Sequence, residues 1–338
     1  MSAKNDTTTI VEEFALKTKQ EQKKERLTRW MPLIILCALC VFFSAACPES
    51  FLTLYNVKTI LNQLAITLII ALGLTFVTLT GAVDLSVDGV VSLGGCLLSV
   101  LVLNSKYATD LGLLGVALSL GVGALFGALS GLLHVKLKVS SFMVTYAMGY
   151  VAQGLAIMSY GGLFASIKDP VLLAVPSTTF LSIPLITWIA LFMFLVAWFI
   201  QERTAFGGYM YAVGTNEAIP RMTGVNVEKV KIKVFIWSGV CMALTGILAA
   251  LRLGSGIVDI GIGQYFPAQA AVVVGGTSLA GGRGGVVNTL VGALIITVLN
   301  IGLLLMGVNA YIRTGIQGLI IVAAVALTIQ RSRRTISQ

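Results

Sequence analysis

The sequence predicts an all-α, polytopic transmembrane bundle of about ten spans, in which some helices are broken. Of its 338 residues, 57% are hydrophobic and 11% are charged, and the mean hydropathy is +0.94. Soluble domains carry about a quarter charged residues, so this chain has too few polar side chains to cover a water-soluble surface. Apolar runs that approach the ~20 residues of a membrane helix recur along the whole chain.

Ten apolar runs define the expected spans. They divide the chain into a polar tail over residues 1–30, a membrane domain over 31–330 and a short tail over 331–338. Two of the runs, 89–104 and 267–281, are short for a membrane helix. The spans are expected at residues 31–47, 61–81, 89–104, 111–135, 139–161, 184–201, 233–253, 267–281, 285–305 and 311–329.

The positions of the basic residues support an even number of spans. With the N-terminus inside, 18 of the 23 Lys and Arg residues fall on inner segments. This is the asymmetry that the positive-inside rule requires, so both termini are expected in the cytoplasm. The net charge of +9 therefore reflects the topology of the chain in the membrane. We expect the lipid bilayer as a partner and no nucleic acid. The five basic residues on the outer side are Lys58, Lys106, Lys168, Arg252 and Arg313.

Three glycines at four-residue spacing predict a close helix contact in the fourth span. Gly123, Gly127 and Gly131 fall on one face of that helix. Helices in lipid associate largely by packing, and small residues let two backbones approach. We interpret this face as a packing interface within the bundle.

Two glycine-rich stretches interrupt apolar runs, at residues 80–89 and 275–285. Each joins two spans through Gly with Ser or Thr, and each is followed by a Val-Val pair. Broken helices at membrane depth occur only where the backbone is buried in protein or lines a wet cavity. Paired breaks in two halves of a chain also point to an internal repeat around a transport path.

Residues for energy conversion or covalent chemistry are nearly absent. The stretch 281–285 is rich in glycine but lacks the lysine of a Walker A motif, so no nucleotide hydrolysis is expected. His134 is the only histidine, and no metal site or cofactor is expected. Ser130 lies one turn before His134, as an intramembrane serine hydrolase would need. No acidic partner or oxyanion motif accompanies the pair, so local packing is favoured.

Polar residues inside the spans define a candidate translocation path. Asp84 and Asp88 are its acidic members; they either cap the following helix, which we favour, or form the ion site of a proton- or sodium-driven carrier. The other members are neutral, which suits a polar, uncharged solute. The candidate path residues are Asn62, Asp84, Ser86, Asp88, Gln153, Gln269, Thr277, Ser278 and Asn288, and Asn300 shares their character.

The long inner loop 202–232 carries the sharpest local signal. Asn216 and Glu217 resemble a helix start and Gly224 a helix end, which predicts a short helix at the cytoplasmic surface. One interpretation is an interfacial helix that holds the loop to lipid headgroups. The other is a docking element for a cytoplasmic partner, with Ile219 and Met222 as apolar contacts. The candidate docking residues are Asn216, Glu217, Ala218, Arg221, Met222 and Gly224.

Four sequence blocks together resemble the ribose-type sugar ABC permeases. They read GAVDLSV at 81–87, TAFG at 204–207, YAVGTNE at 211–217 and GGTSLAGGRG at 275–284. The blocks occur in the family's order, and the resemblance extends from about residue 30 to residue 330. The chain departs from the family at Asp88, where glycine is usual, and within 263–268, where an acidic residue and leucine are usual.

The resemblance implies the membrane subunit of an ATP-driven importer in a bacterial inner membrane. Such a permease pairs with a second permease subunit, expected to be identical, and receives a ribose-like monosaccharide from a periplasmic binding protein. A cytoplasmic ATP-binding subunit supplies the energy, and residues 216–224 would form the coupling helix seated in it. The same resemblance leaves permeases for a nucleoside, an autoinducer or a branched-chain amino acid as alternatives.

Overall fold

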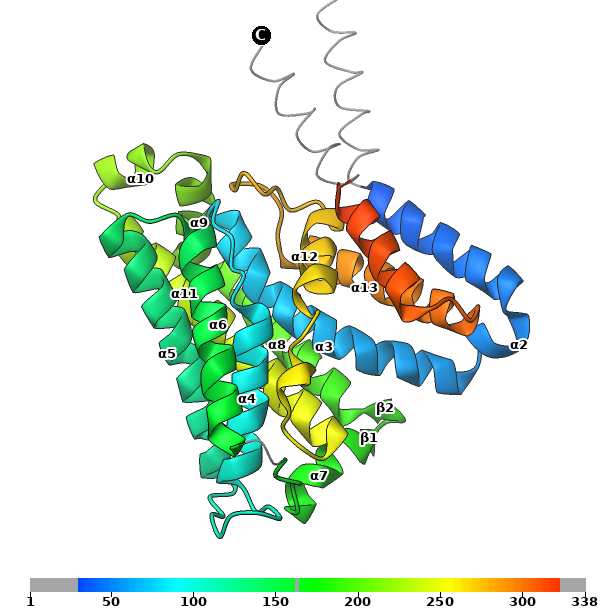
Figure 1. Ribbon diagram of the computed structural model, residues 1–338. Helices are drawn as coiled ribbons and strands as arrows, with labels where there is room; N and C mark the ends of the chain where they lie inside the picture. Colours follow the sequence, from blue (N-terminus) through cyan, green and yellow to red (C-terminus); the bar gives the residue numbers. More distant parts are fainter. Residues whose placement is uncertain (1–29, 162–163, 323–338) are drawn as a thin grey trace, which may run out of the picture.

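The computed structural model describes residues 30–161 and 164–322, and it is a bundle of apolar helices (Figure 1). Six of these helices are long and apolar enough to cross a membrane. Their apolar lengths match the hydrocarbon thickness of a bilayer. The six are α3 (Leu54–Leu79), α5 (Leu113–Leu137), α6 (Ser141–Tyr160), α8 (Leu185–Arg203), α11 (Val227–Leu253) and α13 (Val286–Leu305).

Four shorter helices occupy the remaining apolar runs. They are Trp30–Ala46, α4 (Val87–Leu101), α12 (Tyr265–Val274) and Ala310–Val322. The prediction of a helical membrane bundle is confirmed, since every expected span contains a helix. The count of ten complete spans is not confirmed, because within the described residues six helices have the length to cross.

The expected span 267–281 contains the shorter helix α12, which stops where the glycine-rich stretch 275–285 predicted a break. The helix α12 ends at Val274, and the residues after it are irregular. Ten residues rise only about 15 Å and the fifteen of α4 only about 22 Å, compared with about 30 Å of hydrocarbon. Both are therefore partial-length helices, as expected for broken spans.

The centre of the bundle is formed by α3 and α11. Their most apolar segments are 78% and 72% buried inside the protein, compared with 28% for α8. The helix α11 packs on α3, α4 and α5. A helix that is apolar on all sides and buried by other helices is an interior helix, whereas α8 presents most of its apolar surface outward, as expected toward lipid.

The predicted glycine face of α5 lies against α11. A Cβ added at Gly127 would collide with the carbonyl oxygen of Phe235, and one added at Gly123 would collide with Gly239 and Ala243. Gly131 approaches Ile232 in the same way. The two backbones are in direct contact along this seam, which is possible only because these positions lack side chains.

The segments between the helices lie mainly at two ends of the bundle. At one end are α9 (Ala205–Thr215) and α10 (Ala218–Met222); at the other are α7 (Pro170–Ser177) and a two-stranded hairpin (Figure 1). The hairpin pairs β1 (Thr179–Phe180) with β2 (Ile183–Pro184) in antiparallel register. The remaining short elements are α2 (Pro48–Phe51) and the 3₁₀ turn Val258–Ile260. Residues 1–29 of the expected tail 1–30 lie outside the described residues, as does the expected tail 331–338.

Candidate functional site

The first break, residues 80–86, joins α3 to α4 and is organised by the buried side chain of Asp84. One carboxylate oxygen accepts hydrogen bonds from the backbone N–H of Ser86 at 3.0 Å and from its hydroxyl at 2.6 Å. The other oxygen accepts from the hydroxyl of Ser238 on α11 at 2.9 Å. Among the described residues no basic side chain pairs with Asp84. Neutral donors therefore satisfy it and tie the break to α11.

Hydroxyl groups from α6 satisfy the backbone of the same break. The N–H of Val83 donates to the hydroxyl of Ser141 at 3.0 Å, and the N–H of Leu85 donates to the hydroxyl of Thr145 at 2.9 Å. Irregular backbone inside a membrane protein requires such partners, because lipid offers none. The first break is therefore held by α6 on one side and α11 on the other.

The expectation that Asp84 and Asp88 cap α4 is wrong. The N-cap of α4 is Ser86, and no side chain caps that position. Asp88 instead lies within the first turn of α4, and its carboxylate accepts from the N–H groups of Gly263 at 2.9 Å and Tyr265 at 3.0 Å. Tyr265 is the first residue of α12, so Asp88 caps a helix that is distant in sequence and close in space.

The second break, residues 275–285, is held by its own hydroxyls and by the α8–α9 segment. The N–H of Gly285 donates to the hydroxyl of Thr277 at 3.2 Å. The hydroxyl of Tyr211 on α9 donates to the carbonyl of Gly284 at 2.8 Å. The next residue, Val286, donates its N–H to the side-chain oxygen of Gln201 on α8 at 2.9 Å. The Thr277 hydroxyl therefore stabilises the conformation of the second break itself.

The two breaks touch each other. The N–H of Gly282 donates to the carbonyl oxygen of Leu79, the last residue of α3, at 2.9 Å. A Cβ added at Gly81 would lie 3.4 Å from the carbonyl oxygen of Ala280. Two segments about 200 residues apart in sequence therefore form one junction near the α10 end of the bundle.

The remaining predicted path residues do not form one cluster. The side-chain oxygen of Asn62 and the side-chain nitrogen of Gln269 are buried, with no hydrogen-bond partner in the part of the chain that the structure describes. Gln153 is half-buried and Asn288 is exposed. Asn300 accepts a hydrogen bond from Arg313 at 3.0 Å. Ser278 accepts from the N–H of Ala280 within the second break. Among the predicted path residues that the structure describes, Asn62 and Gln269 are the two with a buried polar atom that lacks a partner.

A cavity of about 370 Å³ lies between α3, α11 and the segment that leads to α12. Its polar lining comes from Gln63, Arg252 and Gln264, none of which was among the predicted path residues. Gln63 follows a predicted path residue directly, which is the signal that could have identified it.

The loop between α8 and α11 contains the expected short helix, α10. The side-chain oxygen of Asn216 accepts from the N–H of Ala218 at 2.9 Å, which begins the helix. Gly224 follows its end with a φ of +81°, a conformation that favours glycine. Ile219 and Met222 are 58% and 87% exposed. The helix thus presents two apolar side chains away from the bundle.

Glu217 attaches this loop to α11. Its carboxylate pairs with Lys231 on α11, and with Arg221 at 3.4 Å one turn along the loop. Partial burial alone would raise the pKa of Glu217, but these two cations outweigh it and hold the pKa below the ordinary value. The carboxylate is therefore charged at neutral pH and fixes the position of α10.

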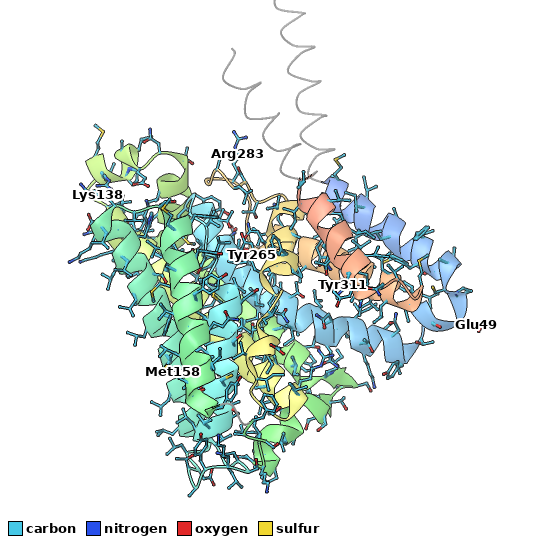
Figure 2. All side chains as sticks on the ribbon, viewed as in Figure 1. Glu49, Lys138, Met158, Tyr265, Arg283 and Tyr311 are labelled. Atoms are coloured by element: carbon cyan, nitrogen blue, oxygen red, sulfur yellow. The ribbon has the colours of Figure 1, made fainter. Side chains whose placement is uncertain are left out.

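Figure 2 places Arg283 and Lys138 at the α10 end of the bundle and Tyr265 at its centre. The second break, which contains Arg283, thus lies at the end of the bundle that carries α10. Beside α10 lies a second cavity, of about 380 Å³, whose lining includes Phe206, Lys229 and Lys233.

The pair Ser130 and His134 does not form a catalytic dyad. The hydroxyl of Ser130 is buried without a hydrogen-bond partner in the described residues. The Nδ1 atom of His134 instead contacts the carbonyl oxygen of Val139 at 2.7 Å. The favoured interpretation of this pair, local packing, agrees with this geometry.

Comparison with known proteins decides the family. The model of the family described as "Branched-chain amino acid transport system / permease component" matches residues 56–325. The chain belongs to this permease family. Its match covers both helix breaks and α10. No solved structure matches the permease.

Several curated relatives of the permease are named for sugars. The ribose import permease protein RbsC of Escherichia coli K12 is 37% identical over 308 residues, which cover 87% of this permease and 91% of the relative. RbsC of Bacillus subtilis is 34% identical over 336 residues, 94% of this permease and all of the relative. The D-allose transport system permease protein AlsC of E. coli is 32% identical over 295 residues, which cover 87% of this permease and 89% of the relative. These relatives confirm the resemblance to ribose-type permeases.

Proposed function

We propose that this chain is the membrane-spanning subunit of an ATP-driven, binding-protein-dependent importer for a sugar of the ribose-like monosaccharide class. The relatives named for ribose and allose support the sugar, as does one named for galactose and methyl galactoside, which is 31% identical. The hydrogen bonds of Asp84 also support it, because the buried carboxylate is already bound by the neutral donors of Ser86 and Ser238.

The observation that carries the proposal is α10. A short helix with Ile219 and Met222 exposed has the form of a docking element, and the Glu217–Lys231 pair fixes it to α11. Apolar anchors within a charged rim are typical of protein interfaces. We assign Asn216, Glu217, Ala218, Arg221, Met222 and Gly224 to the contact with a cytoplasmic ATP-binding subunit.

The other partners and the orientation follow from this assignment. The α10 end faces the cytoplasm of a bacterial inner membrane, and both termini lie on that side, in agreement with the distribution of basic residues. A periplasmic sugar-binding protein meets the opposite end, near α7 and the hairpin. A second permease subunit, identical to this one, completes the translocation path. The chain has no ATPase site of its own, and its partner hydrolyses the ATP.

The test is a double variant in the docking element. Glu217→Ala with Arg221→Ala should reduce sugar uptake and ATPase association about tenfold or more, since both charges at the interface are lost. The matched control is Glu228→Ala, an exposed acid at the start of α11, which should behave as wild type. Unchanged uptake in the double variant would count against the docking role.

The family description also names branched-chain amino acids, which makes them the second candidate solute. A zwitterionic amino acid requires paired charges at its site, whereas a sugar requires neutral donors and acceptors. Uptake of radiolabelled ribose, allose, galactose and leucine by the same vesicles separates the two. Leucine uptake without sugar uptake would mean that the substrate is an amino acid and not a sugar, and it would leave the proposed ATP-driven mechanism unchanged.

A further inference from the structure

The last turn of α9 lies between the two helix breaks, and Gly214 is at the point of contact. A Cβ added at Gly214 would collide with the carbonyl oxygen of Leu79 and would lie 2.5 Å from the backbone nitrogen of Gly282. Leu79 ends α3 at the first break, and Gly282 belongs to the second. The backbone of α9 therefore touches both breaks at one residue.

The neighbours of Gly214 hold the second break as well. Tyr211, one turn earlier, donates its hydroxyl to the carbonyl of Gly284 at 2.8 Å. Thr215 packs on Gly282, where a Cβ would collide with the Thr215 hydroxyl oxygen and lie 3.1 Å from the Thr215 backbone nitrogen. Gly282 has a φ of +70°, which residues with a side chain rarely adopt. Glycine is therefore required there both for this backbone conformation and for the close approach of Thr215. The contacts of Gly214 with Leu79 and Gly282 are between backbone atoms, which have no rotamer by which to relax.

A short, rigid connection joins this contact to α10. Only Asn216 and Glu217 separate α9 from α10. The N–H of Asn216 donates to the carbonyl of Ala212 in α9 at 3.1 Å, and its side chain accepts from Ala218 in α10. Asn216 thus hydrogen-bonds to both helices across the corner. A displacement of α10 would therefore displace α9 as well.

We infer that Gly214 is a positioning residue for transport: it transmits movement of α10 to both helix breaks at the same time. The inference rests on the proposed function, because it requires that a cytoplasmic ATPase moves α10. Close-packed contacts shift as units between discrete arrangements, and this contact connects the docking element to both interruptions in the membrane helices. The two breaks then move together, since Gly282 is also bonded to Leu79.

A pair of glycines in the same helix supplies a matched test. At Gly208 an added Cβ meets nothing within 4 Å, whereas at Gly214 it meets two backbones. Each variant, Gly214→Ala and Gly208→Ala, is purified with its ATPase subunit and reconstituted in vesicles with the binding protein. The measurements are uptake of whichever of ribose, allose and galactose wild type takes up best, ATP hydrolysis, and the amount of ATPase bound.

We expect Gly214→Ala to lower uptake per ATP hydrolysed about tenfold, with the ATPase subunit still bound. Gly208→Ala should remain within about twofold of wild type. A second variant, Tyr211→Phe, removes one hydrogen bond and leaves the ring in place, so it should lower the same ratio about threefold. If Gly214→Ala does not assemble in the membrane, the result for Tyr211→Phe decides.

Two results would overturn the inference. One is a normal ratio of uptake to hydrolysis in Gly214→Ala, or in Tyr211→Phe when that variant decides. The other is loss of the bound ATPase, because the residue would then serve assembly. Both differ from failure of the proposed function, which would appear in wild type as sugar uptake that does not require ATP.

Discussion

The carboxylate of Asp88, in the first turn of α4, accepts a hydrogen bond at 3.0 Å from the N–H of Tyr265, the first residue of α12. The two partial-length helices of the bundle are thus joined at their N-terminal ends. Asp88 and the segment 263–268 are also the two places where the sequence departs from the ribose-type pattern. The structure brings these departures into contact, so they form one feature.

Removing the Asp88 carboxylate should destabilise α12. Asp88→Ala leaves the N–H groups of Gly263 and Tyr265 without their acceptor, which costs about 1–2 kcal/mol at a helix N-cap. Asp88→Asn keeps one acceptor oxygen and should lose about half as much. Thermal unfolding of the purified permease in detergent measures both. The control is Asp110→Ala, at an exposed aspartate, and equal stability of Asp88→Ala and this control would refute the cap.

The α5–α11 seam offers a second matched pair of glycines. Gly127→Ala places a methyl group against the carbonyl of Phe235, whereas Gly121→Ala on the same helix meets open space. We expect Gly127→Ala to lose about 1–3 kcal/mol, because the two helices must separate. Gly121→Ala should be neutral or slightly stabilising. The midpoint of unfolding and the yield of folded protein measure the difference, and similar values for both variants would contradict direct backbone packing.

Substitution of Asp84 separates a structural carboxylate from an ion-coupling one. Asp84→Asn keeps an oxygen for the Ser86 donors, and its amide can donate to Ser238, so uptake should stay within about threefold of wild type. Asp84→Ala leaves buried donors unpaired, at a cost of about 1–3 kcal/mol. A proton- or sodium-driven carrier would instead lose uptake in Asp84→Asn. Uptake measured with and without an ion gradient distinguishes the two mechanisms.

The ion pairs of Glu217 should stabilise the permease in a pH-dependent manner. Its pKa is lower in the folded protein than the ordinary value of 4.5, because Lys231 and Arg221 outweigh the effect of burial. The contribution is therefore complete above pH 4.5 and is lost as the pH falls through the lowered value. At pH 7 the free energy of unfolding of wild type should exceed that of Glu217→Gln by less than about 1 kcal/mol, because the pair is partly exposed.

Unfolding of wild type and Glu217→Gln at neutral pH and near pH 3 gives this difference directly. The difference should shrink at the lower pH and also in high salt, which screens exposed charges. A difference that is the same at both pH values would mean that Glu217 acts through packing.

Local signals were sufficient for α10 and for the positions of the helices. Asn216 and Gly224 delimit α10 because a side-chain cap and a left-handed glycine act within a few residues. Gly123 and Gly127 are recognisable as a packing face because a four-residue spacing puts them on one side of a helix. Neither signal depends on which distant segment lies opposite.

The partners of the helix breaks could not be predicted in this way. Asp88 precedes an apolar run in a pattern that is typical of a local cap, yet it caps α12. Gln63 and Gln264 line one cavity from separate parts of the chain.

The amino-acid sequence by itself determined that this protein is a helical membrane bundle with a capped helix in its long loop. Hydrophobic length and local hydrogen bonding decide those features over a few turns of chain. Only the tertiary structure decided that Gly214 meets both breaks and that Asp84 binds Ser238. The reason is physical: a buried backbone group must find a partner wherever packing brings one, and packing joins residues that no local pattern relates.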